Sequence, residues 1–149
     1  MYDLIIIGAG VVGCALAAEA TRFSDKVLVL EKKFDVCEGA SKANSGIVHA
    51  GYDAKPGTNK AKFNLIGAKM MEELSKKLKV PYKMNGALVL GFDEEDRKSI
   101  NSLLERAKIN GVENCELIEK EKILEIEPNI NQDVDCALWV KNSAIISPY

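Results

Sequence analysis

The chain has 149 residues, 47% of them hydrophobic, so it is long enough and apolar enough to fold around its own core. Twenty lysines and arginines against 22 acids give a formal net charge of −2, and only 6% of the residues are aromatic. This composition argues against nucleic acid as a partner, because it supplies neither a basic surface nor many rings on which bases stack.

The four cysteines and the single histidine do not indicate a metal site. No two cysteines form a Cys-x-x-Cys pair, and one histidine is too few for the usual ligand sets. The cysteine spacing shows no disulfide framework, which predicts reduced thiols in a cytoplasmic protein. The N-terminus lacks the pattern of a signal peptide, and the uncharged run over 4–18 is too short to cross a bilayer. Peripheral attachment at a membrane stays open.

The first thirty residues read as a strand, a helix and a second strand. The continuous apolar run at 4–7 predicts a buried strand, and the alanine-rich segment 11–21 predicts a helix. A second apolar run at 27–30 ends at Glu31. This order predicts an α/β fold with a parallel sheet, namely a Rossmann-like domain that binds FAD or NAD(P).

The turn between the first strand and the helix fits the pattern G-x-G-x-x-G through Gly8, Gly10 and Gly13. Glycines at these places permit a tight turn, a close approach of the backbone to a pyrophosphate, and close packing of helix on strand. The helix N-terminus adds free N–H groups and a positive dipole end. Glu31 is placed to accept hydrogen bonds from ribose hydroxyls, and its charge disfavours the 2′-phosphate of NADP.

The segment 34–59 reads as a long loop, which in a compact domain is typically functional or disordered. A helix is predicted at 60–79, followed by a tight turn at Asn85-Gly86 and a strand at 87–92. A further helix is predicted over 94–110, with Asp93 as its N-cap and Gly111 as its stop. Short strands near 115–118 and 136–140 flank a charged helix at 119–127. The apolar face of the 60–79 helix consists of Phe63, Ile66, Met70, Leu74 and Leu78.

We expect residues 1–80 to form the FAD-binding, Rossmann-type portion and residues 81–149 to begin a mixed α+β substrate-binding (cap) domain. Two parallel strands are too few for a finished α/β layer. We therefore expect the chain to be the N-terminal part of a longer protein that supplies the remainder of both domains.

The residues after Glu31 favour FAD over NAD as the cofactor. An NAD domain normally continues with another helix and strand. This chain instead enters a loop of small residues that contains Ser41, Ser45, Gly46 and His49. Small residues allow backbone amides to approach an extended ligand such as a flavin dinucleotide.

Three segments, "DLIIIGAGVVGCALAAEA", "VLVLEK" and "GASKANSGIVHAGYD", together resemble the FAD-dependent oxidoreductases of the D-amino-acid oxidase (DAO) superfamily. Within it the sequence is most similar to the glycerol-3-phosphate dehydrogenase/oxidase branch, with L-2-hydroxyglutarate oxidases nearby. The string A-N-S-G-x-x-H-A-G is far more specific than the glycine turn. The similarity continues through "FNLIGAKMMEELSKKL" and "AIISPY", and so spans nearly the whole chain.

The resemblance implies oxidation of sn-glycerol 3-phosphate to dihydroxyacetone phosphate by hydride transfer to FAD, with this chain as the N-terminal part of the enzyme. L-2-hydroxyglutarate or another 2-hydroxy acid is the alternative small-molecule substrate. A second alternative is a nucleotide-binding fragment that has no catalysis of its own. The electron acceptor, including an acceptor protein as partner, stays open.

The resemblance also implies roles for single residues. The three glycines of the turn are expected to bind the pyrophosphate, and Glu31 is expected to bind the adenosine ribose. Lys32 is expected to lie beside the adenine end. Residues of the small-residue loop are expected to contact the phosphates and to lie along the flavin. One serine of this loop is also expected to contact the substrate. The loop residues implied are Ala40 and Ser41 at the phosphates, Ser45 and Gly46 along the flavin, and Ser45 at the substrate.

His49 is the candidate catalytic and substrate-binding residue, because the resemblance places it near the flavin and the substrate alcohol. Imidazole is the side chain best suited to accept a hydroxyl proton near pH 7. Two alternatives stay open: a structural or solvent-facing histidine, and covalent attachment of FAD. Lys60 and Lys62 could attract a phosphorylated substrate or simply form a solvated helix start.

Overall fold

The structure, a computed structural model, describes residues 1–148. Contacts divide these residues into two compact units, Met1–Ser45 together with Pro148, and Gly46–Ser147. The boundary predicted near residue 80 concerns the domains of the intact protein and stays a prediction.

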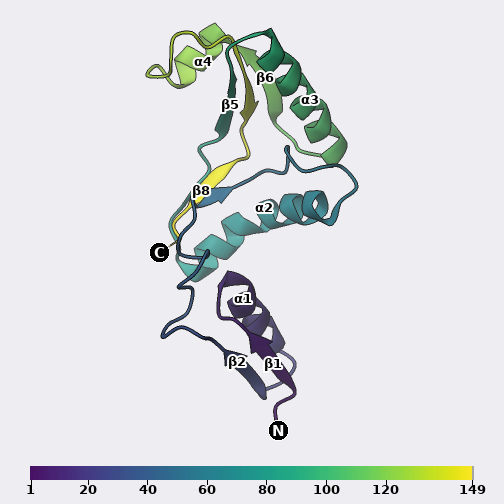
Figure 1. The fold of residues 1–149 in the computed structure, drawn as a ribbon, viewed down its shortest axis with the longest axis vertical. Coiled ribbons are helices and arrows are strands. Elements are labelled where there is room, and N and C mark those ends of the chain that lie inside the picture. The colour runs from purple at the N-terminus through teal and green to yellow at the C-terminus, as the bar shows by residue number, and fades with distance from the viewer. Residues whose placement is uncertain (149) are drawn as a thin grey trace. The chain divides into compact units, whose positions relative to one another are not determined.

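The first unit is a β-α-β arrangement (Figure 1). Strand β1 (Leu4–Ile7) pairs in parallel with β2 (Val27–Leu30), and helix α1 (Val11–Ala20) packs against both strands. The α/β fold with a parallel sheet, predicted from the apolar runs, is confirmed.

The prediction that β1 is buried is wrong for most of its side chains. Ile6 is 6% exposed. Its side chain faces α1, because a Cβ built on Gly13 of that helix would lie only 3.5 Å from it. Ile5 and Ile7 are 53% and 87% exposed. Successive side chains of a strand point to opposite faces, so these two lie on the side away from α1.

In chain order the elements of the second unit are β3 (Ile47–Val48), α2 (Asn59–Leu78), β4 (Tyr82–Lys83), β5 (Ala87–Gly91), α3 (Glu94–Asn110), β6 (Cys115–Glu119), α4 (Lys120–Ile126), β7 (Cys136–Val140) and β8 (Ala144–Ile146). The strands form two antiparallel sheets of three strands each, in the orders β3-β8-β4 and β5-β7-β6. Helix α3 contacts all three strands of the β5-β7-β6 sheet, and α4 contacts β6 and β7 (Figure 1).

Strand β7 is the centre of the core. Alternate residues of β7 enter two separate apolar clusters, which fits the two-residue period of a strand. The larger cluster joins β7 to α3 and contains Ala50, Ile100, Ala107, Val112, Cys136, Leu138 and Val140. The smaller cluster consists of Ile118, Ile123, Val134 and Ala137.

The ends of the long helices agree with the sequence signals. The carboxylate of Asp93 accepts hydrogen bonds at 2.9 Å from the N–H groups of Glu95 and Asp96, which confirms it as the N-cap of α3. Gly111 ends α3 in the left-handed region. Among residues 1–148, no helix is both long enough and apolar enough to cross a membrane.

The apolar face of α2 does not pack on the core described above. Its five predicted residues are 41–61% exposed. The side of α2 that meets the core instead carries Leu65, and its buried positions are Ala61 and Ser75. The helix was therefore predicted correctly, but the face of α2 that packs against the core of this unit is not the face that the spacing indicated.

Asn85-Gly86 is not a tight turn. The residues before and after it belong to different sheets, because β4 pairs with β8 whereas β5 pairs with β7. The two residues carry the chain from one sheet to the other, and the N–H of Gly86 donates to the carbonyl of Ser143 at 2.9 Å. The sequence also missed β3 and β4, which have only two residues each, and the three-residue strand β8.

Candidate functional site

The glycine turn has the geometry that the motif predicts. Gly8 has a φ of +98°, which glycine adopts without strain, and its N–H donates to the carbonyl of Leu30 at 2.7 Å. A Cβ at Gly13 would lie 1.9 Å from the carbonyl oxygen of Gly8. No side chain fits at Gly13, so the close approach of α1 to the turn requires glycine there.

Helix α1 receives its cap from a distant residue. Gly10, at the N-cap, has no side chain to offer, and the hydroxyl of Ser41 accepts the N–H of Val11 at 2.9 Å. A hydroxyl that accepts this bond still has its own proton to donate to an anion. The N–H groups of Gly10, Val12 and Gly13 have no acceptor inside the helix. This end of α1 therefore carries free donors and the positive end of the helix dipole, a combination that favours the binding of a phosphate.

The carboxylate of Glu31 is tied to the same turn. One oxygen accepts the N–H of Ala9 at 2.8 Å, and the other accepts the N–H of Lys33 at 2.9 Å. These two bonds, that of Ala9 first, lower the pKa of Glu31 below its ordinary value. The group is thus ionised at neutral pH, and its remaining lone pairs can accept bonds from ribose hydroxyls.

A pocket of about 270 Å³ lies beside this turn within the first unit. Five residues selected from the sequence line it: Gly10, Glu31, Lys32, Ala40 and Ser41. The sequence did not indicate the other residues that line this pocket. They lie between Lys32 and Ala40 in the chain, so their position beside predicted site residues was the available signal. They are Lys33, Cys37, Glu38 and Gly39.

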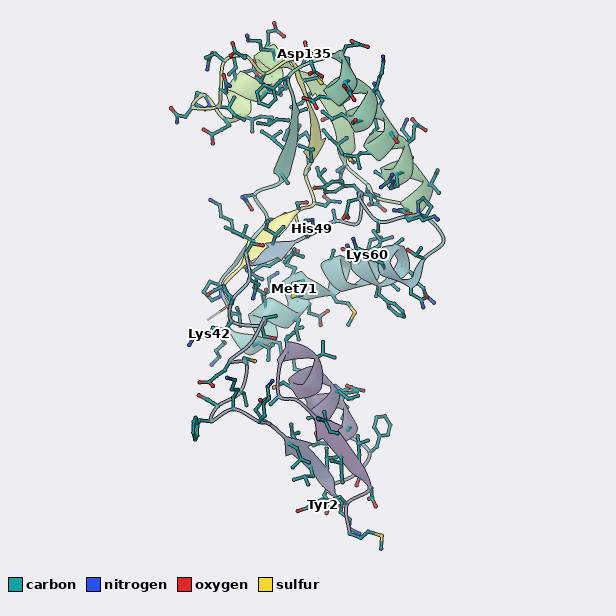
Figure 2. All side chains as sticks on the ribbon, viewed as in Figure 1. Tyr2, Lys42, His49, Lys60, Met71 and Asp135 are labelled. Atoms are coloured by element: carbon teal, nitrogen blue, oxygen red, sulfur yellow. The ribbon has the colours of Figure 1, made fainter. Side chains whose placement is uncertain are left out.

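His49 belongs to the second unit, directly after β3 (Figure 2). Its side chain is exposed, and its ring centroid lies 6.4 Å from that of Tyr52. Burial raises the pKa of the Tyr52 hydroxyl above its ordinary value. Ser45 ends the first unit and Gly46 begins the second. The roles expected for His49, Ser45 and Gly46 stay predictions, as do those of the residues at the pocket.

The backbone after His49 is held by helix α3. The side-chain amide of Asn110 donates to the carbonyls of Gly51 at 2.9 Å and Ala54 at 2.7 Å. Arg106 donates to the carbonyl of Asp53 at 2.8 Å. Both side chains come from the last turns of α3, so the short loop after His49 is fixed to the core of the second unit.

The two lysines at the start of α2 are exposed, and each contacts a nearby side chain. The ammonium group of Lys60 lies 3.2 Å from a carboxylate oxygen of Asp53. The ammonium group of Lys62 lies 5.5 Å from the ring centroid of Phe63. These contacts agree with a solvated helix start.

Comparisons with known proteins identify the family of the chain. The family model described as FAD dependent oxidoreductase matches residues 3–149. The glycerol 3-phosphate dehydrogenase of Caloramator mitchellensis is 46% identical over 149 residues, which are 100% of this chain and 31% of that protein. The mitochondrial L-2-hydroxyglutarate dehydrogenase of Caenorhabditis elegans is 37% identical over 147 residues, 97% of this chain and 34% of that protein.

A solved structure shows the same fold. The L-alpha-glycerophosphate oxidase from Mycoplasma pneumoniae, dithionite-reduced and with FAD bound, superimposes with a TM-score of 0.89 at 32% identity. The match covers 98% of this chain and 39% of that one. The chain thus spans about a third of the length of the curated relatives it matches.

Proposed function

Because the chain belongs to the FAD dependent oxidoreductase family, we propose that its first unit holds the ADP half of FAD. The pocket at the start of α1 is the observation that carries this proposal, since it combines N–H donors, a hydroxyl and an ionised carboxylate. This donor set fits a diphosphate joined to a ribose. The turn and Ser41 would hold the pyrophosphate, Glu31 the ribose hydroxyls, and Lys32 and Ala40 the neighbouring adenine and phosphate edges.

Titration of the purified chain with FAD tests this assignment directly. Flavin fluorescence should change with saturable, one-to-one binding, and ADP should compete for the same site. Absence of binding would leave the isolated chain without a cofactor site of its own. FAD binding that ADP does not displace would place the contact elsewhere on the flavin nucleotide.

For the intact enzyme that contains this chain, we propose oxidation of sn-glycerol 3-phosphate to dihydroxyacetone phosphate. The relatives named as glycerol 3-phosphate dehydrogenase and oxidase support this substrate, at 46% and 39% identity. Bound FAD supplies the hydride acceptor. His49 would accept the proton of the substrate hydroxyl, because imidazole groups serve as general bases, and Ser45 would donate a hydrogen bond to the substrate.

The second candidate substrate is L-2-hydroxyglutarate, supported by the C. elegans relative at 37% identity. Anaerobic mixing of the intact enzyme with each compound distinguishes the two. Bleaching of the flavin absorbance by glycerol 3-phosphate supports the first substrate. Bleaching by L-2-hydroxyglutarate alone would overturn it and leave the assignment of the cofactor intact.

The role of His49 is tested by His49→Ala in the intact enzyme. Loss of a general base should slow flavin reduction about 10²- to 10⁴-fold while FAD remains bound. Lys42→Ala, at an exposed position of the preceding segment, is the control and should reduce flavin at the normal rate. An unchanged rate in His49→Ala would remove the base assignment, and loss of a covalently held flavin would indicate attachment instead.

A further inference from the structure

Two thiols lie together beside the glycine turn of the first unit. The sulfur of Cys14, on α1, lies 3.3 Å from the carbonyl oxygen of Ala9. The sulfur of Cys37, in the segment after β2, lies 3.6 Å from the same oxygen. Both residues are partly exposed, and both are free cysteines. The two thiols also interact with each other, since the Cys14 side chain is among the groups that raise the pKa of the Cys37 thiol.

The surrounding backbone keeps this arrangement in place without the thiol protons. The N–H of Cys37 donates to the carbonyl of Ala9 at 2.9 Å, and Ala9 is only 3% exposed. That buried carbonyl therefore keeps a hydrogen-bond donor if both S–H groups are lost. Cys37 also has a φ of +59°, a left-handed conformation that residues with a Cβ adopt rarely. Such a conformation persists only where the surroundings impose it.

We propose that Cys14 and Cys37 form a reversible disulfide that fastens the segment carrying Cys37 to helix α1. An S–S bond of about 2.05 Å requires the two sulfurs to leave their shared oxygen and turn toward each other. The main chain at Cys37 is already hydrogen-bonded to the turn that precedes α1. The segment that carries Cys37 therefore lies beside the start of α1 before the disulfide forms.

A hydroperoxide is the chemical class of oxidant that completes this step. One thiolate attacks the O–O bond, releases hydroxide and becomes a sulfenic acid. The second thiol then displaces water from that sulfur and forms the disulfide. In total, two thiols and one hydrogen peroxide give one disulfide and two waters. Burial, and then the neighbouring Cys14, raise the pKa of the Cys37 thiol, so oxidation should become faster as the pH rises above neutral.

The disulfide would act on the pocket itself. Cys37 lines the pocket together with Gly10 and Ser41. Oxidation would join one wall of the pocket covalently to the helix whose N-terminus forms another. The proposed disulfide does not depend on the proposed function, because its formation is measured on the chain without FAD.

The experiment treats the reduced full chain with hydrogen peroxide, blocks the remaining thiols with an alkylating agent, and maps the peptides without reduction. We expect a monomer with two blocked thiols instead of four, and one linked pair of peptides that contains Cys14 and Cys37. Dithiothreitol should restore four thiols. Cys14→Ala and Cys37→Ala should each prevent the link. Peptide mapping of the unaltered chain decides the question even if a variant fails to fold.

Other results would overturn the proposal. They are four free thiols after a treatment that oxidises methionine in the same sample, a disulfide between chains, or a link that uses Cys115 or Cys136. Those two cysteines belong to the second unit, where burial raises the pKa of Cys115 to about 11 and Cys136 is fully buried. They serve as internal controls that should stay reduced.

Discussion

The hydroxyl oxygen of Ser41 lies 2.9 Å from the backbone nitrogen of Val11, although 30 residues separate them in the chain. The residue at the N-cap of α1 is Gly10, which has no side chain with which to cap the helix. The start of the helix is therefore completed by the loop after the second strand. Ser41 also lines the candidate pocket, so the side chain that caps the helix is the one that we propose binds a phosphate.

Replacing Ser41 with alanine should weaken FAD binding about tenfold or more, since a hydrogen bond to a charged group contributes about 1.5–3 kcal/mol. The dissociation constant from flavin fluorescence measures the effect. Ser24→Ala is the matched control in the same unit, because the Ser24 hydroxyl bonds Asp3 at 2.7 Å and does not line the pocket. Equal affinities of the two variants would show that Ser41 does not touch the ligand.

Alanine at Gly13 should abolish FAD binding, because its Cβ would lie 1.9 Å from the carbonyl oxygen of Gly8 and would force α1 away from the turn. Gly67→Ala is a matched control within α2, where a Cβ meets nothing within 4 Å. That variant should retain FAD binding and gain about 0.5–1 kcal/mol in free energy of unfolding. Normal FAD binding by Gly13→Ala would contradict the observed packing.

The stability of the glycine turn should depend on pH through Glu31. Its pKa is lower in the folded chain than in the unfolded chain, so its contribution is fully present above the ordinary value of 4.5. That contribution is lost as the pH falls through the lower, folded value. Thermal unfolding of the normal chain should therefore show an acid-dependent decrease that is smaller in Glu31→Gln. An equal decrease in the normal chain and in Glu31→Gln would contradict this contribution of Glu31.

Removing the amide of Asn110 should loosen the loop after His49. Asn110→Ala leaves the carbonyls of Gly51 and Ala54 without this donor, which should lower the free energy of unfolding by about 1–3 kcal/mol. Asn101→Ala, at an exposed position of the same helix, should change it by less than about 0.5 kcal/mol. Urea unfolding of both variants provides the comparison. Equal stabilities would mean that solvent replaces the bonds of Asn110 without loss.

Local signals in the sequence were enough to predict most elements of the fold. The strand, the glycine turn and the helix that succeed one another over 4–20 each carry their own signature, and so does the N-cap at Asp93. The two-residue strands β3 and β4 have no such signature, because they exist only through pairing with β8. The Asn85-Gly86 prediction was wrong for the same reason: the flanking strands find partners elsewhere in the sequence.

The candidate site could be predicted only where residue type alone implies chemistry. The turn glycines, Glu31 and Ser41 met that condition, and several of them line one pocket. The bond from Ser41 to Val11 and the meeting of Cys14 with Cys37 are tertiary contacts between distant positions. No spacing rule within a helix or a strand relates such positions, so only the folded chain reveals them.

A crystal structure of this chain with FAD is the most direct measurement of how the cofactor is held. We predict a pyrophosphate oxygen within hydrogen-bond distance of the Ser41 hydroxyl and the N–H of Val12, and a ribose hydroxyl on the carboxylate of Glu31. FAD bound with its pyrophosphate away from the start of α1, or with Glu31 out of contact with the ribose, would contradict the proposed site.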